Sequence, residues 1–288
     1  MSTQITTAFV EQYSSNVSML AQQMGSRLRS AVDVETVRGK HAFFDQIGVT
    51  AAQVRSTRHG ATPQINTPHS RRRVGLADYE WADLVDDLDK VRMLVDPTSS
   101  YAKAAAAAMN RSIDDVIITA IGGQAQTGVS GGTNQLLPSS SKFATSAQSD
   151  GMTIAKLLAA KHFFDAGDVD PSIKRYIVCG AKQIQDLLGT TSVTSADFNT
   201  VKALASGQVD SFLGFQFIMS NRLALANTDD RLCYAFTQDA VKLAIGADVK
   251  AKISERDDKS YATQVYYSMA LGAVRMEEEK VFEIPCDE

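Results

Sequence analysis

The clearest pattern of apolar and polar positions lies between residues 96 and 123. Asp96 can cap a helix, Pro97 suits its first turn, residues 104–108 are all alanine, and Gly122 with Gly123 can end it. The sequence therefore predicts one helix of roughly 37 Å, at about 1.5 Å per residue. Its apolar stripe, with the spacing of one helix face, comprises Ala105, Met109, Ile113, Val116, Ile117 and Ala120.

The residues before this helix predict two segments that have no core of their own. Residues 1–35 carry helix-like apolar spacing around Phe9, Tyr13 and Val17, which predicts an arm with one apolar face. Residues 49–81 form two weakly alternating segments around a tip rich in Gly, Pro, Asn and Ser, which is typical of a long two-stranded excursion. Because a lone hairpin is marginal in water, we expect it to lie against another surface.

The residues after the long helix predict an α+β fold. A polar Gly/Ser loop is expected at 124–150. Alternation after residue 245 predicts antiparallel strands that return to the long helix. Between these parts the sequence predicts helices and strands at 153–164, 174–180, 181–189, 214–223 and 231–236.

Composition narrows the classes of function. Of the 288 residues, 44% are hydrophobic, which is enough for a sizeable core. The formal charge of −4, from 29 basic and 33 acidic residues, argues against a dedicated nucleic-acid binder, whose affinity rests on a basic excess. Cys179, Cys233 and Cys286 are widely spaced and are expected to be free thiols in a reducing compartment. We find no signal peptide and no apolar stretch near the roughly 20 residues of a membrane helix, so we expect no membrane contact.

Candidate chemistry is sparse. Gly128–Gly132 reads G-x-S-x-G around Ser130, but the motif needs a strand before the serine and a helix after it, whereas a helix precedes it and a Ser-rich loop follows. We therefore favour a flexible loop. The four histidines show no zinc pattern, and no phosphate-binding glycine loop occurs. The sequence predicts no catalytic, cofactor or metal site. The four histidines considered for zinc binding are His41, His59, His69 and His162.

The order of the elements resembles that of the major capsid protein of tailed bacteriophages. An arm, a long two-stranded excursion, a spine helix, an α/β section and closing strands follow one another over about residues 53–284. No single segment is distinctive, but five similar segments occur in the right order. They are YAKAAAAAMNRSIDDVIITAIGG, RYIVCGAKQIQDLLG, GQVDSFLGFQFIMSNRL, YAFTQDAVKLA and YYSMALGAVRMEEEKVFEI.

The resemblance implies the phage major capsid protein fold and a structural, non-enzymatic subunit. Hexamers and pentamers of such a subunit would form an icosahedral virion capsid around double-stranded DNA, which the shell contacts nonspecifically. A portal protein is an implied partner, separate scaffolding and decoration proteins are allowed, and assembly is expected in the host bacterial cytoplasm. The implied divisions are an N-terminal arm at 1–38, an extended loop at 39–85, an axial domain at 151–244, and a peripheral domain at 86–150 and 245–288.

The sequence leaves three alternatives open. The first is an encapsulin-type shell, a cellular nanocompartment of the same fold, although the N-terminal arm favours the viral case. The second is a serine hydrolase that uses Ser130. The third is a nucleic-acid-binding module, for which binding should weaken steeply with salt.

Three consecutive arginines, Arg71, Arg72 and Arg73, stand at the start of the returning strand of the extended loop. Acidic residues follow, among them Asp83, Asp86 and Asp87. Arginine pairs with carboxylates in a bidentate geometry that gives orientation as well as attraction. We therefore hypothesise that the triplet clamps one subunit to the acidic residues of the next.

Overall fold

The described part of the chain forms two compact units in a computed structural model. The first unit contains residues 22–26, 78–85, 98–112 and 247–270, and the second contains the other described residues. Three elements continue from one unit into the other: helix α2, Thr98–Gly122, strand β11, Val241–Arg256, and strand β12, Ala262–Arg275. The structure describes residues 22–55, 57, 58, 60, 62, 64–85, 98–143, 150–189, 211–226 and 230–288.

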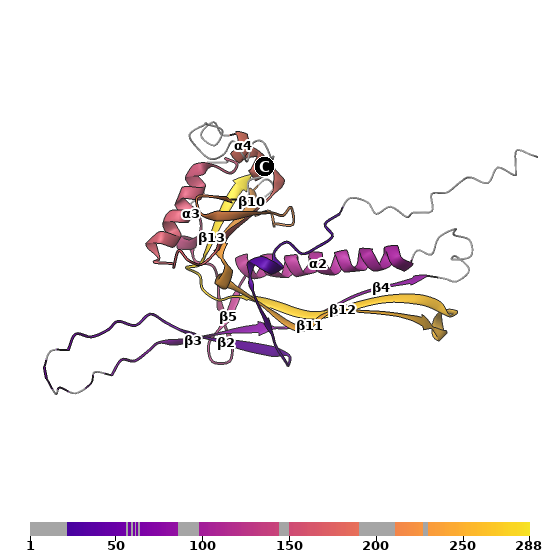
Figure 1. Ribbon diagram of the computed structural model, residues 1–288, viewed down its shortest axis with the longest axis horizontal. Coiled ribbons are helices and arrows are strands. Elements are labelled where there is room, and N and C mark those ends of the chain that lie inside the picture. Colours follow the sequence, from indigo (N-terminus) through magenta and orange to yellow (C-terminus); the bar gives the residue numbers. More distant parts are fainter. Residues whose placement is uncertain are drawn as a thin grey trace, which may run out of the picture. The chain divides into compact units, whose positions relative to one another are not determined.

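The predicted spine helix is confirmed as α2, Thr98–Gly122 (Figure 1). Of the predicted apolar stripe, Val116 and Ala120 are only half-buried. The predicted cap residues Asp96 and Pro97 lie outside the described residues. Full burial recurs at every fourth position, as expected for one helix face, at Ala105, Met109, Ile113, Ile117 and Ile121.

The α/β section of the second unit matches its prediction. Strand β10 lies antiparallel to both β13 and β7, whereas β7 and β9 are parallel. A parallel pair needs a crossover, and helix α4, Ala181–Gly189, lies in that connection. The sheet has the order β13-β10-β7-β9-β8, with β7 Arg175–Cys179, β8 Ser211–Phe212, β9 Phe215–Met219, β10 Asp230–Thr237 and β13 Val281–Asp287.

Helix α3, Ile154–Ala166, supplies the aromatic core beside this sheet. The ring centroids of Phe163 and Phe282 are 4.9 Å apart, and those of Phe164 and Phe215 are 5.9 Å apart. Phe164 and Phe215 are fully buried, and tilted aromatic pairs at these separations add to the burial of their apolar area. The apolar side chains predicted for this helix therefore pack in the core of the second unit.

The extended loop differs from its prediction. Strand β2, His41–Ile47, pairs antiparallel with β3, His69–Gly75, so pairing starts before Val49 and ends before Trp81. The described residues from 48 to 68 contain no strand. Strand β4, Ala77–Val85, belongs to a different sheet, with β1 Asp33–Thr36, β11 Val241–Arg256 and β12 Ala262–Arg275 in the order β1-β11-β12-β4.

The predicted Gly/Ser loop at 124–150 contains two strands among its described residues, 124–143 and 150. Strands β5, Ala125–Thr127, and β6, Thr133–Gln135, form a small hairpin, and β5 pairs with β3 to give the sheet order β2-β3-β5-β6. A cluster of buried side chains that includes Phe44, Val74 and Val274 lies under this sheet. The root of the extended loop therefore has its own small core.

The N-terminal arm is described only from residue 22. Residues 1–21 lie outside the described residues, and residues 22–28 form no helix, in contrast to the predicted arm helix; only a short 3-10 turn follows at Arg29–Ala31. The backbone N–H groups of Arg27 and Leu28 donate to the carboxylate of Asp114, at 3.0–3.2 Å. Asp114 is fully buried in α2, so these bonds hold Arg27 and Leu28 against that helix within the second unit.

Candidate functional site

The arginine triplet lies on β3 at the root of the extended loop. Side chains alternate between the two faces of a strand, so Arg72 points opposite to Arg71 and Arg73. Arg72 is only 7% exposed, whereas the other two are half-buried. The triplet therefore divides into one buried arginine and two outward ones.

Arg72 is bound within its own chain. Its Nε donates to the carbonyl oxygen of Met276 at 2.8 Å, and its Nη2 donates to Glu278 Oε2 at 2.7 Å. The Gln46 side-chain amide donates to the same Met276 oxygen at 3.0 Å. Both strands of the loop root, β2 and β3, are thus tied to the segment that follows β12.

Arg275 stands on the other side of Glu278 and is completely buried. Its Nη1 donates to the carbonyl oxygens of Ile121 and Gly123, at 2.8 and 2.6 Å, and its Nη2 donates to that of Gln135 at 3.0 Å. These carbonyl groups include the carboxyl end of α2, where a cation is favoured by the helix dipole. Burial lowers the pKa of Arg275 from its usual value, and the nearby Glu278 opposes this shift.

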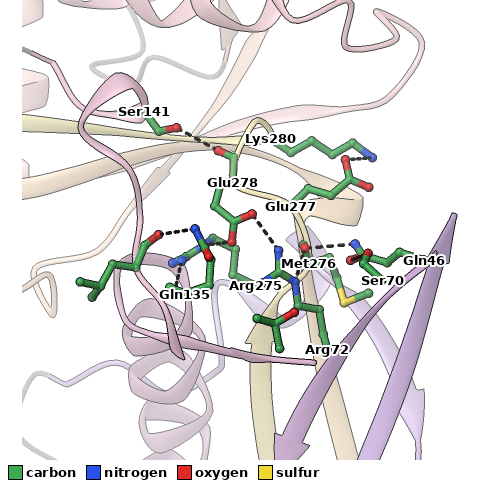
Figure 2. Close-up of polar contacts among 12 residues, drawn as sticks. Gln46, Ser70, Arg72, Gln135, Ser141, Arg275, Met276, Glu277, Glu278 and Lys280 are labelled. Atoms are coloured by element: carbon green, nitrogen blue, oxygen red, sulfur yellow. Dashed lines mark hydrogen bonds and ion pairs between the residues drawn. The ribbon is translucent and has the colours of Figure 1, made fainter. Parts of the chain in front are cut away.

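Glu278 thus joins two buried arginines, as Figure 2 shows. Its Oε1 lies 3.6 Å from Arg275 Nε, and its backbone oxygen accepts a bond from Ser141 Oγ at 3.2 Å. We call Arg72, Arg275 and Glu278 the junction cluster. It connects the loop root to the end of α2 and to the segment after β6, so it sets where the extended loop leaves the body of the second unit.

The two outward arginines contact side chains at the protein surface. Arg71 makes a bidentate pair with Asp45 on β2, at 2.5 and 3.1 Å, and its guanidinium lies 5.4 Å from the centroid of the Phe43 ring. Arg73 Nη2 lies 2.8 Å from His41 Nε2. The Arg73 side chain also fills the space beside Gly131, whose φ of +71° and crowding disfavour a larger residue. Both arginines remain accessible from outside.

The hydrogen bond from Arg71 lowers the pKa of Asp45. A lowered folded-state pKa means that the pair stabilises the fold above the unfolded pKa, and that this contribution is lost as the pH falls. We expect Arg71→Gln to raise the pKa of Asp45 towards about 4, as measured by an NMR titration. Arg58→Gln, which has no contact with Asp45, should leave that pKa unchanged, and an unshifted pKa in Arg71→Gln would contradict this assignment.

The acidic partners predicted for the triplet are only partly described. Asp83 is half-buried on β4 in the first unit, and its carboxylate accepts a bond from the Leu84 N–H at 2.9 Å. Asp86 and Asp87 lie outside the described residues. The intersubunit role of the whole set stays a prediction.

Ser130 lies at the exposed tip of the β5–β6 hairpin. Helix α2 precedes the motif, as expected, but the short strand β5 comes between α2 and the serine. The element after the serine is β6, a strand, so the helix that would complete a nucleophile elbow does not follow. The hairpin instead serves the sheet that supports the extended loop.

The three cysteines are free and fully buried in β7, β10 and β13 of one sheet. Burial raises the pKa of Cys179 to about 12, so its thiol stays protonated and unreactive. Within the described residues, no group of His, Cys, Asp and Glu side chains could hold a metal ion. In the same part of the chain, no helix is long and apolar enough to cross a membrane.

Sequence reasoning missed Arg275 and Glu278. The available signal was an arginine at the end of an otherwise apolar strand, in the stretch MALGAVRM, because a charge in such a strand needs a buried partner. The glutamates at 277–279 supply that partner.

Comparison with known proteins identifies the family. A model of the phage capsid protein family matches residues 5–288, so the chain belongs to that family. It is a structural capsid subunit rather than an enzyme, and the encapsulin and hydrolase alternatives are not favoured. No curated protein is significantly similar in sequence.

Solved structures show the same fold. The capsid structure of cyanophage P-SCSP1u is 18% identical, with a TM-score of 0.77, over 100% of this chain and 96% of that chain. A structure from Mycobacterium phage Che8 is 19% identical, with a TM-score of 0.70, over 96% and 97%. The cyanophage Pam1 capsid is 12% identical, with a TM-score of 0.72, over 98% and 97%. The predicted phage major capsid protein fold is therefore confirmed.

Proposed function

We propose that this chain assembles into hexamers and pentamers of an icosahedral shell that encloses double-stranded DNA. The observation that carries the proposal is the extended loop, whose root is fixed by the junction cluster while its apolar side chains face outward. Ile47, Val49 and Val54 are 71%, 98% and 94% exposed. Exposed apolar side chains gathered on one segment are typical of a surface that is covered in an assembly.

Further partners are part of this proposal. They are a portal protein, packaged DNA contacted nonspecifically, and separate scaffolding and decoration proteins where the phage encodes them. Assembly is proposed in the host bacterial cytoplasm. The division into an arm at 1–38, an extended loop at 39–85, a peripheral domain at 86–150 and 245–288, and an axial domain at 151–244 belongs to the same proposal.

We also propose that the arginine triplet helps to clamp neighbouring subunits, with Arg71 and Arg73 as the contacting side chains. The side chain of Arg71 is 41% exposed and Arg73 is half-buried, with its Nε covered. The proposed partners are acidic residues of the next copy, including Asp83, Asp86 and Asp87. Arg72 contributes indirectly, because its bonds to the segment after β12 hold β3 in place.

The test is negative-stain imaging of the expressed protein. Closed shells are expected from the original chain, and a monomer that forms no particles under any condition would refute the proposal. Arg71→Ala with Arg73→Ala should lower the particle yield while the thermal unfolding midpoint of the subunit falls only slightly, because the Arg71–Asp45 pair is exposed. A normal yield from this double variant would refute the clamp alone.

A further inference from the structure

A groove of about 950 Å³ lies beside the junction cluster, within the second unit. Apolar side chains from three segments line one part of it, among them Ile47, Phe143 and Phe163. Residues 277–279, three consecutive glutamates, line another part. We call this surface the glutamate groove.

The glutamates differ in how far their charges are neutralised. Glu278 is held between the two arginines of the junction cluster. Glu277 lies 3.2 Å from Lys280, but that lysine is closer to Asp239, at 2.6 Å. Glu279 is exposed and forms no ion pair with another described residue. Arg72 and Lys142 also line the groove, but Arg72 is paired with Glu278 and Lys142 with Glu283 at 3.1 Å. The carboxylates of Glu277 and Glu279 therefore leave the outer part of the groove with negative charge beside apolar surface.

Helix α3 extends the apolar surface next to this groove. Ala159, Phe163 and Ala166 of α3 line the groove, and Leu158 on the same helix is 49% exposed. His162 and Asp165 of α3 are exposed as well, so the helix surface is mixed. Its apolar contribution to the groove is the face that carries Ala159, Phe163 and Ala166. A partner that is both apolar and positively charged would therefore complement this surface.

The extended loop has that composition. Residues 48–68 contain Arg55 and Arg58 and no acidic residue. Val54 is 94% exposed, and both arginines are exposed beside it. At about 3.3 Å per extended residue, the loop can carry this tip roughly 30 Å from β2.

We propose that Val54, Arg55 and Arg58 of one copy seat in the glutamate groove of a second copy. This inference rests on the proposed function and specifies which surface of the neighbour receives the loop. Val54 covers apolar surface of the groove, and the arginines face Glu277 and Glu279. Such opposite charges set the register of a contact and suppress wrong pairings.

Reciprocal charge reversal tests the contact. The groove variant is Glu277→Lys with Glu279→Lys, and the loop variant is Arg55→Glu with Arg58→Glu. Each should lower the particle yield about tenfold or more, because like charges then meet at every copy of the contact. A chain that carries all four changes has the original net charge and should assemble to within about threefold of the original yield.

A matched control separates complementarity from net charge. Lys250→Glu with Lys252→Glu changes two exposed lysines of β11; combined with the groove variant, it restores net charge but should not restore assembly. Mixing the groove variant with the loop variant should give oligomers that contain both. In such oligomers the glutamates of the altered loop meet the lysines of the altered groove, and the unaltered loop meets the unaltered groove. This result would show that the contact joins two copies.

The outcomes are decisive. Three results would overturn the inference while the proposed shell stands. They are normal assembly of either reversed variant, no rescue by the fourfold variant, and equal rescue by the lysine control. Absence of particles from the original chain would overturn both. Circular dichroism and thermal unfolding establish that each subunit is folded. If the groove variant does not fold, the pair Glu279→Lys with Arg58→Glu replaces the fourfold variant in the rescue experiment. Glu279 is suited to this because it has no ion pair among the described residues.

Discussion

Arg275→Met is expected to lower the free energy of unfolding by about 3–5 kcal/mol, the range for removing one partner of a buried ion pair. Methionine retains much of the apolar stem of the side chain but cannot donate hydrogen bonds. The carbonyl oxygens of Ile121, Gly123 and Gln135 would lose their guanidinium donors, and Glu278 would keep only Arg72. Urea unfolding of the dissociated subunit measures the change.

Arg256→Met provides the matched control. Arg256 pairs with Asp258 at 2.8 and 2.9 Å, but both side chains are largely exposed, at 43% and 50%. Surface pairs contribute little to stability, so the midpoint of unfolding should hardly move. Similar losses in the two variants would show that the junction cluster has no special weight in the fold.

The second large effect is expected for Asp114→Ala, at about 2–4 kcal/mol, because it leaves two backbone N–H groups without their acceptor in a buried site. Those groups belong to Arg27 and Leu28, at the start of the second unit. The change should also free the preceding segment, so limited proteolysis should cut near residue 27 faster than in the original subunit.

Asp115→Ala at the next position distinguishes this anchor from a general effect on α2. Asp115 pairs with Arg222 at the surface, where an ion pair contributes about 0–1 kcal/mol. Unchanged proteolysis in Asp114→Ala, or an equal increase in Asp115→Ala, would contradict the anchoring role.

Much of the fold follows from local patterns. The four-residue repeat of α2, the helix of residues 154–166 and the buried strand RYIVC all carry signals within their own residues. The short strands β5 and β6 do not, because three residues become a strand only when a neighbour such as β3 is already in place. The break at residue 76, where the chain passes from one sheet to another, is set by tertiary pairing in the same way.

The candidate site was predictable only in part. A run of three arginines is visible in the sequence, but its division into one buried and two outward side chains follows from the strand alternation of β3. The partner of Arg72 lies more than 200 positions away in Glu278, and no local pattern reports that distance. The functional meaning of the triplet therefore depends on the fold.

The junction cluster also has a consequence for the order of folding on the ribosome. Its members come from positions 72, 275 and 278, and Arg275 binds carbonyl groups at 121–135. Such long sequence separations delay the closing contacts. During synthesis the bonds from Arg72 to Met276 and Glu278 form only after almost the whole chain has emerged. A nascent chain that stops before residue 275 has the strand pairing of its loop root but lacks the junction cluster.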